Sequence, residues 1–162
     1  MTYCVALRLD QGLLFMSDTR TNAGVDNIST FRKMFNWSVE GDRVITILTA
    51  GNLATTQAVV SLLNERSVIP ADRKQTLLAA PTMFQVARLV GDTLKEVIHS
   101  QAEEGQTAES TFGATMIVGG QIRGMEPRLF LVYPEGNFIE ASNETPFFQA
   151  GETKYGRPII LR

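Results

Sequence analysis

The sequence predicts an α+β domain in which two mainly antiparallel sheets carry helices on their outer faces. Three observations lead to this fold class. Short apolar segments bounded by turn residues fill the first third and the last third of the chain, and each is too short for a helix. Between them lie two longer segments whose apolar residues recur every three or four positions. Strands, a helix pair and strands again are typical of helices layered on antiparallel sheets.

Composition fits one globular domain, residues 1–162, and excludes several classes of function. Of the 162 residues 44% are hydrophobic and 20% charged, and the formal net charge is −2, so no nucleic-acid or anionic membrane partner is expected. Cys4 is the one cysteine and His99 the one histidine, which excludes an internal disulfide and leaves no metal or cofactor expected. No segment has the length of a membrane span or the features of a signal peptide, which favours a cytoplasmic location.

The chain opens with a predicted β-hairpin that turns at Asp10-Gln11-Gly12. This hairpin carries Asp18 back to the level of Thr2. Initiator Met is normally removed when the next residue is as small as Thr, so Thr2 is expected as the mature N-terminus. A terminal Thr carries a hydroxyl that can attack a carbonyl and an α-amine, with an ordinary pKa of about 7.7–8.0, that can accept the proton.

The next segments predict a second hairpin and a helix. The polar stretch 21–30 has loop composition and is expected to be a surface loop. Apolar segments 33–38 and 43–50 flank the turn Glu40-Gly41-Asp42 as two strands, so four strands precede any helix. Gly51 interrupts the pattern, Asn52 is a plausible N-cap, and helical spacing continues to about Ser67 before Pro70.

The second half predicts one more helix and then strands. The helix begins near Pro81-Thr82 and runs out within the polar stretch 103–106. Strands are expected at 111–118 before Gly119-Gly120, at 128–133, at 138–141 after a turn, and at 147–150 before Gly151. Residues 152–162 resemble the beginning of another helix. Because the chain stops inside an apolar run, the expectation is that the domain continues past Arg162 and that the missing part supplies a helical layer on the opposite face.

This order, with Thr2 behind the initiator Met, resembles the N-terminal nucleophile hydrolases and specifically the proteasome β-type subunits. The segments Met-Thr-Tyr-Cys-Val-Ala-Leu, Ser-Asp-Thr-Arg and Gly-Glu-Thr-Lys-Tyr-Gly look like one branch, the bacterial proteasome-related family called Anbu, for ancestral β subunit. The resemblance implies a four-layer αββα sandwich. It also implies catalytic roles for four residues that match the family's positions: Thr2, Asp18 (followed by Arg20), Lys33 and Gly51.

The implied roles agree with simple chemistry. Lys33 beside Thr2 would lower the pKa values of the amine and hydroxyl, and Asp18 would keep Lys33 oriented and charged. Gly51, at the entry to a helix, would offer its free N–H to an oxyanion. Four further positions match residues that line the first specificity pocket in relatives and would favour an apolar side chain: Thr21, Phe31, Thr49 and Leu53.

The resemblance implies a threonine-type peptidase that acts on peptides or proteins through an acyl-enzyme, in a homo-oligomer that forms a closed or helical ring. One departure is clear, because Gly151-Glu152 stands where typical β subunits have a Ser-containing turn. Two alternatives therefore stay open: a non-catalytic assembly or binding subunit, and a hydrolase of a small dedicated amide. On the blander interpretation Asp18 and Arg20 form a surface ion pair, Lys33 is solvated and Gly51 serves only the turn.

Overall fold

The computed structural model describes residues 2–22, 28–68, 76–101 and 111–161. Within these ranges it contains the following strands and helices, in chain order: β1 (Tyr3–Leu9), β2 (Gly12–Ser17), β3 (Arg20–Asn22), β4 (Ile28–Thr30), β5 (Met34–Val39), β6 (Arg43–Gly51), α1 (Leu53–Val68), α2 (Met83–Gln101), β7 (Ala114–Ile122), β8 (Arg128–Val132), β9 (Phe138–Glu140), β10 (Phe147–Gly151) and α4 (Thr153–Ile160).

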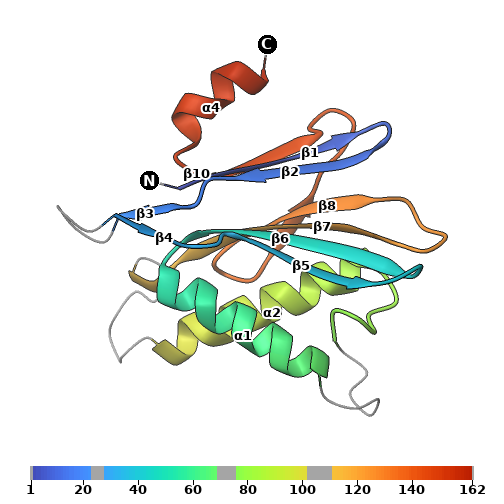
Figure 1. Cartoon of the computed structure of the whole chain (residues 1–162), viewed down its shortest axis with the longest axis horizontal. Helices are drawn as coiled ribbons and strands as arrows, with labels where there is room; N and C mark the ends of the chain where they lie inside the picture. The colour runs from blue at the N-terminus through green and yellow to red at the C-terminus, as the bar shows by residue number, and fades with distance from the viewer. Residues whose placement is uncertain (1, 23–27, 69–75, 102–110, 162) are drawn as a thin grey trace.

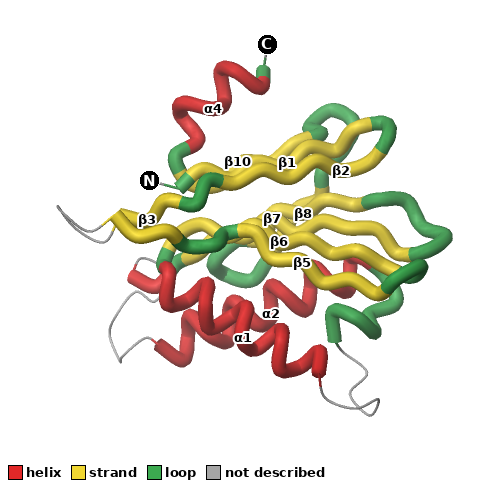
Figure 2. The backbone as a smooth tube through the Cα atoms, in the orientation of Figure 1, coloured by secondary structure: helices red, strands yellow, loops and turns green. Residues whose placement is uncertain are grey.

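Two antiparallel sheets face each other. One has three strands in the order β10-β1-β2, the other has five in the order β5-β6-β7-β8-β9, and β3 and β4 form a separate two-stranded ribbon. Helices α1 and α2 lie side by side on the outer face of the five-stranded sheet, and α4 lies on the outer side of the three-stranded sheet (Figure 1, Figure 2). The predicted mixed α+β class, with two sheets and a helix pair on one face, is confirmed.

Apolar side chains form two buried clusters, one on each face of the five-stranded sheet. Alternation along β6 makes this possible, since Ile45 and Ile47 pack toward the helices whereas Leu48 and Ala50 pack toward the three-stranded sheet. The second cluster also contains Cys4 from β1. The packing between the sheets therefore extends to the part of β1 that follows Thr2.

The helices begin where the sequence predicts. Asn52 caps α1, because its Oδ1 accepts a hydrogen bond of 3.1 Å from the backbone N–H of Thr55. Thr82 accepts one of 3.2 Å from the N–H of Gln85 at the start of α2. The predicted ends of these helices, at Pro70 and at 103–106, lie outside the described residues.

The prediction of a surface loop at 21–30 is wrong at its two ends, where β3 and β4 pair in the register Thr21–Ser29. In the described part of the chain, six strands and not the predicted four therefore precede α1. The sequence of this segment is polar and lacks the alternating apolar pattern by which strands are recognised.

The prediction that a strand at 111–118 ends at Gly119-Gly120 is also wrong, because β7 begins at Ala114 and runs through both glycines to Ile122. A Cβ at Gly119 would lie 2.7 Å from the ring of Phe15 on the facing sheet, and one at Gly120 would overlap the carbonyl oxygen of Val44. Glycine is required there by close packing of neighbouring atoms and does not mark a turn.

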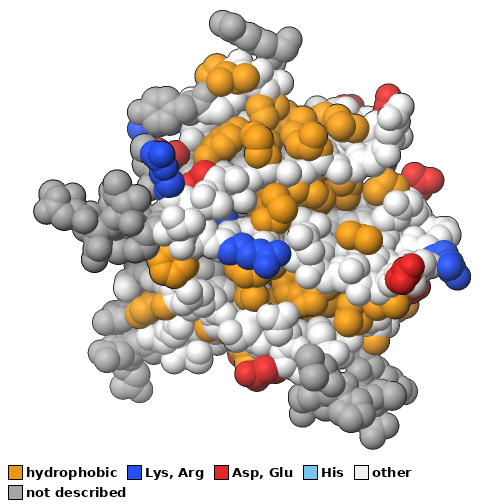
Figure 3. Space-filling view, viewed as in Figure 1, with side chains coloured by type: hydrophobic (Ala, Val, Ile, Leu, Met, Phe, Trp, Pro, Cys, Tyr) orange, Lys and Arg blue, Asp and Glu red, His pale blue; other side chains and the backbone are white. Residues whose placement is uncertain are grey.

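The outer face of the three-stranded sheet carries exposed apolar side chains. Figure 3 shows hydrophobic side chains gathered over this sheet, and on β2 Leu14 is 44% and Met16 53% exposed. Among the described helices, none is long and apolar enough to cross a membrane.

Candidate active site

Thr2 lies at one end of the three-stranded sheet, just before β1 and beside the residues that follow β2 and β10. The N–H of Tyr3 donates to Asp18 Oδ1 at 2.8 Å, and the N–H of Asp18 donates to the Tyr3 carbonyl at 3.1 Å. On the other side the N–H of Glu152 donates to the Thr2 carbonyl at 2.7 Å, and a Cβ at Gly151 would overlap that carbonyl. The predicted return of Asp18 to the level of Thr2 is confirmed, and Gly151-Glu152 binds Thr2 through the backbone.

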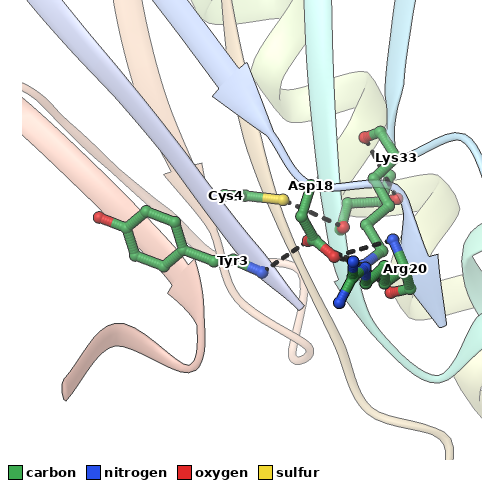
Figure 4. A network of polar contacts seen from close by, with 6 residues as sticks. Tyr3, Cys4, Asp18, Arg20 and Lys33 are labelled. Atoms are coloured by element: carbon green, nitrogen blue, oxygen red, sulfur yellow. Dashed lines mark hydrogen bonds and ion pairs between the residues drawn. The ribbon is translucent and has the colours of Figure 1, made fainter. Parts of the chain in front are cut away.

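Lys33 and Asp18 form a shielded ion pair at the end of this hairpin. Lys33 Nζ lies 2.8 Å from both carboxylate oxygens of Asp18, and the two side chains are 7% and 31% exposed. Nζ also donates to the carbonyl of Arg20, whose own N–H donates to Asp18 Oδ2 at 2.9 Å. Figure 4 shows Asp18 between the Tyr3 amide and the Lys33 ammonium. Three oxygens thus accept from the three N–H groups of Lys33.

These hydrogen bonds set the charge of Asp18. Burial by itself would raise the pKa of the carboxyl, but hydrogen bonds from Lys33, from the N–H of Tyr3 and from that of Arg20, together with the Lys33 charge, outweigh burial and lower it. Asp18 is therefore a carboxylate at neutral pH.

Gly51 ends β6 and lies two residues before α1. The N–H of Thr49 donates to the Lys33 carbonyl at 2.9 Å, so the N–H of Gly51, two residues along the strand, faces the same side. Since β5 begins only at Met34, no strand of the described sheet pairs with Gly51 on that side. The Gly51 N–H is therefore directed past the end of β5, and the positive end of the α1 dipole lies nearby.

The four residues matched to a specificity pocket lie on different elements. Thr49 is buried on β6 beside Lys33, Phe31 is half-buried with its N–H bonded to the Thr19 carbonyl, and Leu53 is half-buried at the first position of α1. The backbone of Thr21 belongs to β3, but its side chain lies outside what the structure describes. Their common pocket stays a prediction.

A cavity of about 330 Å³ borders both Gly51 and Gly151 and was not foreseen from the sequence. It is lined by small or uncharged residues: Ala50, Gly51, Gly113, Ala114, Thr115, Pro134 and Gly151. The glycines at 113 and 151 are the one sequence signal that could have indicated it, since a glycine opposite another strand allows backbones to approach closely.

Cys4 is not a second nucleophile. The thiol is fully buried, burial raises its pKa to about 12, and its Sγ lies 3.5 Å from the Thr49 carbonyl. In the part of the chain that the structure describes, no three His, Cys, Asp or Glu side chains converge as they would to hold a metal ion.

The fold closely matches solved structures of one family. Over 99% of this chain it is similar to Anbu (ancestral β-subunit) from Yersinia bercovieri, with 49% identity and a TM-score of 0.90. The chain belongs to the Anbu family. Anbu from Hyphomicrobium sp. strain MC1 is 53% identical with a TM-score of 0.87, and the chain in a helical assembly of the Anbu complex from Pseudomonas aeruginosa is 45% identical with a TM-score of 0.89, each over 99% of this chain.

Anbu is a family of proteasome-related β-subunits, as the resemblance implied. This chain spans 65% of the length of each of the three Anbu chains compared above. No family model and no curated protein matches the sequence.

Proposed function

We propose that this chain is a threonine-type N-terminal nucleophile amidohydrolase that cleaves peptides or proteins. One observation carries the proposal: the Asp18 carboxylate binds both the N–H next to Thr2 and the buried Lys33 ammonium. That bridge fixes a buried cation beside the start of β1, where Thr2 lies, in a member of a proteasome-related family. An ordinary surface ion pair at a strand end needs neither the burial of Lys33 nor the contact with Tyr3.

In the proposed mechanism, removal of Met1 exposes the α-amine of Thr2. This amine takes the proton of the Thr2 hydroxyl while Oγ attacks the amide carbon. The oxyanion that forms is held by the Gly51 N–H, and collapse of the intermediate expels the amine with the transferred proton. Water then attacks the ester by the same route, regenerating the hydroxyl and releasing the acid.

Lys33 serves in this mechanism as a fixed cation and not as the base. Its three N–H groups donate to two Asp18 oxygens and to the Arg20 carbonyl, so the nitrogen has no lone pair to offer. A cation that near Thr2 would lower the pKa values of both the amine and the hydroxyl. The α-amine is then the one base within the Thr2 residue itself.

Specificity and assembly are parts of the same proposal. Phe31 and Leu53, with Thr21 and Thr49, would favour an apolar side chain before the cleaved bond. A homo-oligomer, as a closed or helical ring in the cytoplasm, would keep the nucleophile away from folded proteins. A helical assembly is described for the Pseudomonas aeruginosa Anbu complex. Light scattering that finds only monomer at micromolar concentration in the full-length chain would contradict this assembly.

The proposal includes the four-layer αββα arrangement, with a helical layer over the three-stranded sheet. Two features support it. A Cβ at Gly156 of α4 would overlap the Tyr3 side chain, so α4 already packs on that side. Leu14 and Met16 leave an apolar surface there for further helices.

The test is covalent labelling of Thr2. Protein with a free Thr2 amine, exposed to a peptide β-lactone or boronate, should gain one adduct that peptide mass spectrometry assigns to Thr2. The Thr2→Ala variant should gain none, and Thr2→Ser, which keeps a hydroxyl and an amine, should be labelled. Labelling that survives Thr2→Ala would remove the nucleophile assignment.

A processed protein that is folded and assembled, yet takes no label and cleaves no peptide in a broad library, would favour the non-catalytic assembly subunit. Turnover of such a library without any partner would count against both the non-catalytic subunit and the hydrolase of one small dedicated amide.

A further inference from the structure

The side chain of Asn52, next to Gly51, makes contacts in two directions. Its Oδ1 caps α1 through the N–H of Thr55 at 3.1 Å, while its Nδ2 donates to the carbonyl of Thr111 at 3.3 Å. The backbone N–H of Asn52 also donates to the Gly113 carbonyl at 3.0 Å. An ordinary N-cap needs only the first of these bonds. Asn52 therefore also fastens the start of α1 to the segment 111–113.

Thr55 makes a second connection to the same segment. Its hydroxyl is fully buried and lies 2.8 Å from the Phe112 carbonyl oxygen, 2.9 Å from Gln101 Oε1 at the end of α2 and 3.4 Å from Asn52 Oδ1. A Thr within a helix commonly returns its hydroxyl to a carbonyl of its own helix, as Thr56 does with Leu53 at 2.9 Å. Thr55 instead binds outside α1, which indicates a role in holding 111–113.

Segment 111–113 in turn packs directly on Gly51. A Cβ at Gly51 would lie 2.6 Å from the Gly113 oxygen and 2.8 Å from Ala114 Cα, and the φ of Gly51 is +114°, which favours glycine. The peptide plane that carries the Gly51 N–H thus lies against a backbone that Asn52 and Thr55 fasten. A shift of 111–113 would allow this peptide to rotate.

We propose that Asn52 and Thr55 are positioning residues that hold the Gly51 N–H in the orientation needed to bind an oxyanion. This inference rests on the proposed function of Gly51 and assigns its support to side chains that do not touch substrate. An oxyanion donor works only when it lies about 2.7–3.1 Å from the developing charge, and a displacement of about 1 Å can cost 10²-fold in rate. The rate of acylation should therefore depend on the Thr55 hydroxyl more than substrate binding does.

The test compares Thr55→Val with Thr56→Val in the full-length, processed protein. Both substitutions remove a buried hydroxyl from the first turn of α1, but only that of Thr55 holds 111–113. Thr55→Val should lower kcat at least about 10-fold relative to the parent protein, with KM changed by no more than about 2-fold. It should also weaken the binding of a peptide boronate more than the binding of a non-covalent peptide of the same sequence. Thr55→Ser, which keeps the hydroxyl, should have the parent's kcat and boronate affinity. Thr56→Val should leave kcat within about 2-fold of the parent value.

Asn52 offers a second arm. Asn52→Asp keeps the cap oxygen but cannot donate to Thr111, so it should lower kcat while the melting temperature changes little. Asn52→Ala, which also removes the cap, should lower both. Equal kcat in Asn52→Asp and the parent protein, together with equal kcat in Thr55→Val, would overturn the inference.

Hydrogen exchange keeps the inference separate from the proposed function. The backbone amides of 51–53 should exchange faster in Thr55→Val than in Thr56→Val, because the bond from Asn52 N–H to the Gly113 carbonyl loosens. A parent protein without activity but with this exchange difference would refute the proposed function and keep the anchoring of Gly51. Unchanged exchange in Thr55→Val would refute the anchoring, whatever the activity.

Discussion

The Asp18–Lys33 pair should respond very unequally to the loss of its two members. Asp18→Ala leaves the Lys33 ammonium, which is 7% exposed, with the Arg20 carbonyl as its one hydrogen-bond acceptor among the described residues. Removing one partner of a buried ion pair costs about 3–5 kcal/mol. Because the Asp18 side chain is 31% exposed, water can replace part of its hydrogen bonding to Lys33 in the variant. We therefore expect a loss near the lower end of this range, about 3 kcal/mol in the free energy of unfolding.

Lys33→Met should cost less. The Asp18 carboxylate would keep two backbone donors, the N–H of Tyr3 and that of Arg20, and it would remain in contact with solvent. The charged hydrogen bonds that are lost are worth about 1.5–3 kcal/mol each at most, and the buried Met side chain offsets part of that loss. We expect a net loss of about 1–2 kcal/mol. The double variant Asp18→Ala, Lys33→Met contains no unpaired ammonium. Its loss in the free energy of unfolding should therefore be little more than that of Asp18→Ala alone.

Urea unfolding followed by tryptophan fluorescence and circular dichroism measures all four proteins, with the midpoint and the slope fitted separately. The expected coupling energy is about 1–2 kcal/mol. The reasoning would be refuted by a Lys33→Met variant that is as unstable as Asp18→Ala, or by losses that add within about 0.5 kcal/mol.

Three further outcomes are expected. Because the folded pKa of Asp18 lies below its unfolded value, its contribution to stability is present above about pH 4 and is lost as the pH falls through the lower, folded value, so Asp18→Asn should flatten the stability profile below pH 4 in acid titrations. The Cys4 thiol, with its pKa raised to about 12, should resist iodoacetamide at pH 8 in the native protein and react in urea, as mass spectrometry would record; rapid native alkylation would contradict its burial. Gly120→Ala should lower the free energy of unfolding by about 1–3 kcal/mol, because its Cβ would overlap the Val44 carbonyl oxygen. Gly124→Ala should also lower it, but through backbone strain alone, because Gly124 has a φ of +76° and its Cβ would meet no atom within 4 Å.

The sequence predicted helices, strands and turns correctly where residues close together in the chain determine the local conformation. The turn at Gly12, the cap at Asn52 and the helical spacing of α2 depend on neighbours within a few residues, and all three are confirmed. The strand through Gly119 and Gly120 was wrongly predicted to end at these glycines. Glycine is required there because of close contacts with Phe15 and Val44, which are distant in sequence. No local pattern contains that information.

The candidate site divides in the same way. Asp18 and Lys33 were predicted from their order in the chain and from the family resemblance, and the structure brings them together at 2.8 Å. The carbonyl of Arg20 and that of Phe112 were not predicted, because every residue has a main-chain carbonyl and the sequence does not indicate which ones face a lysine or a threonine.

The residues of the candidate site are divided between two sheets that share no strand. Thr2 and Asp18 border the three-stranded sheet, at the start of β1 and the end of β2. Lys33 directly precedes β5 of the five-stranded sheet, and Gly51 ends β6 of the same sheet. A folding intermediate with both sheets formed but not yet docked would have most of its secondary structure and no working nucleophile. Under the proposed function, the amide-cleaving group would arise only in the last step of folding, and this order would keep a nascent or partly unfolded chain from hydrolysing its neighbours. On heating, such a protein should lose its proposed peptidase activity before its circular dichroism changes.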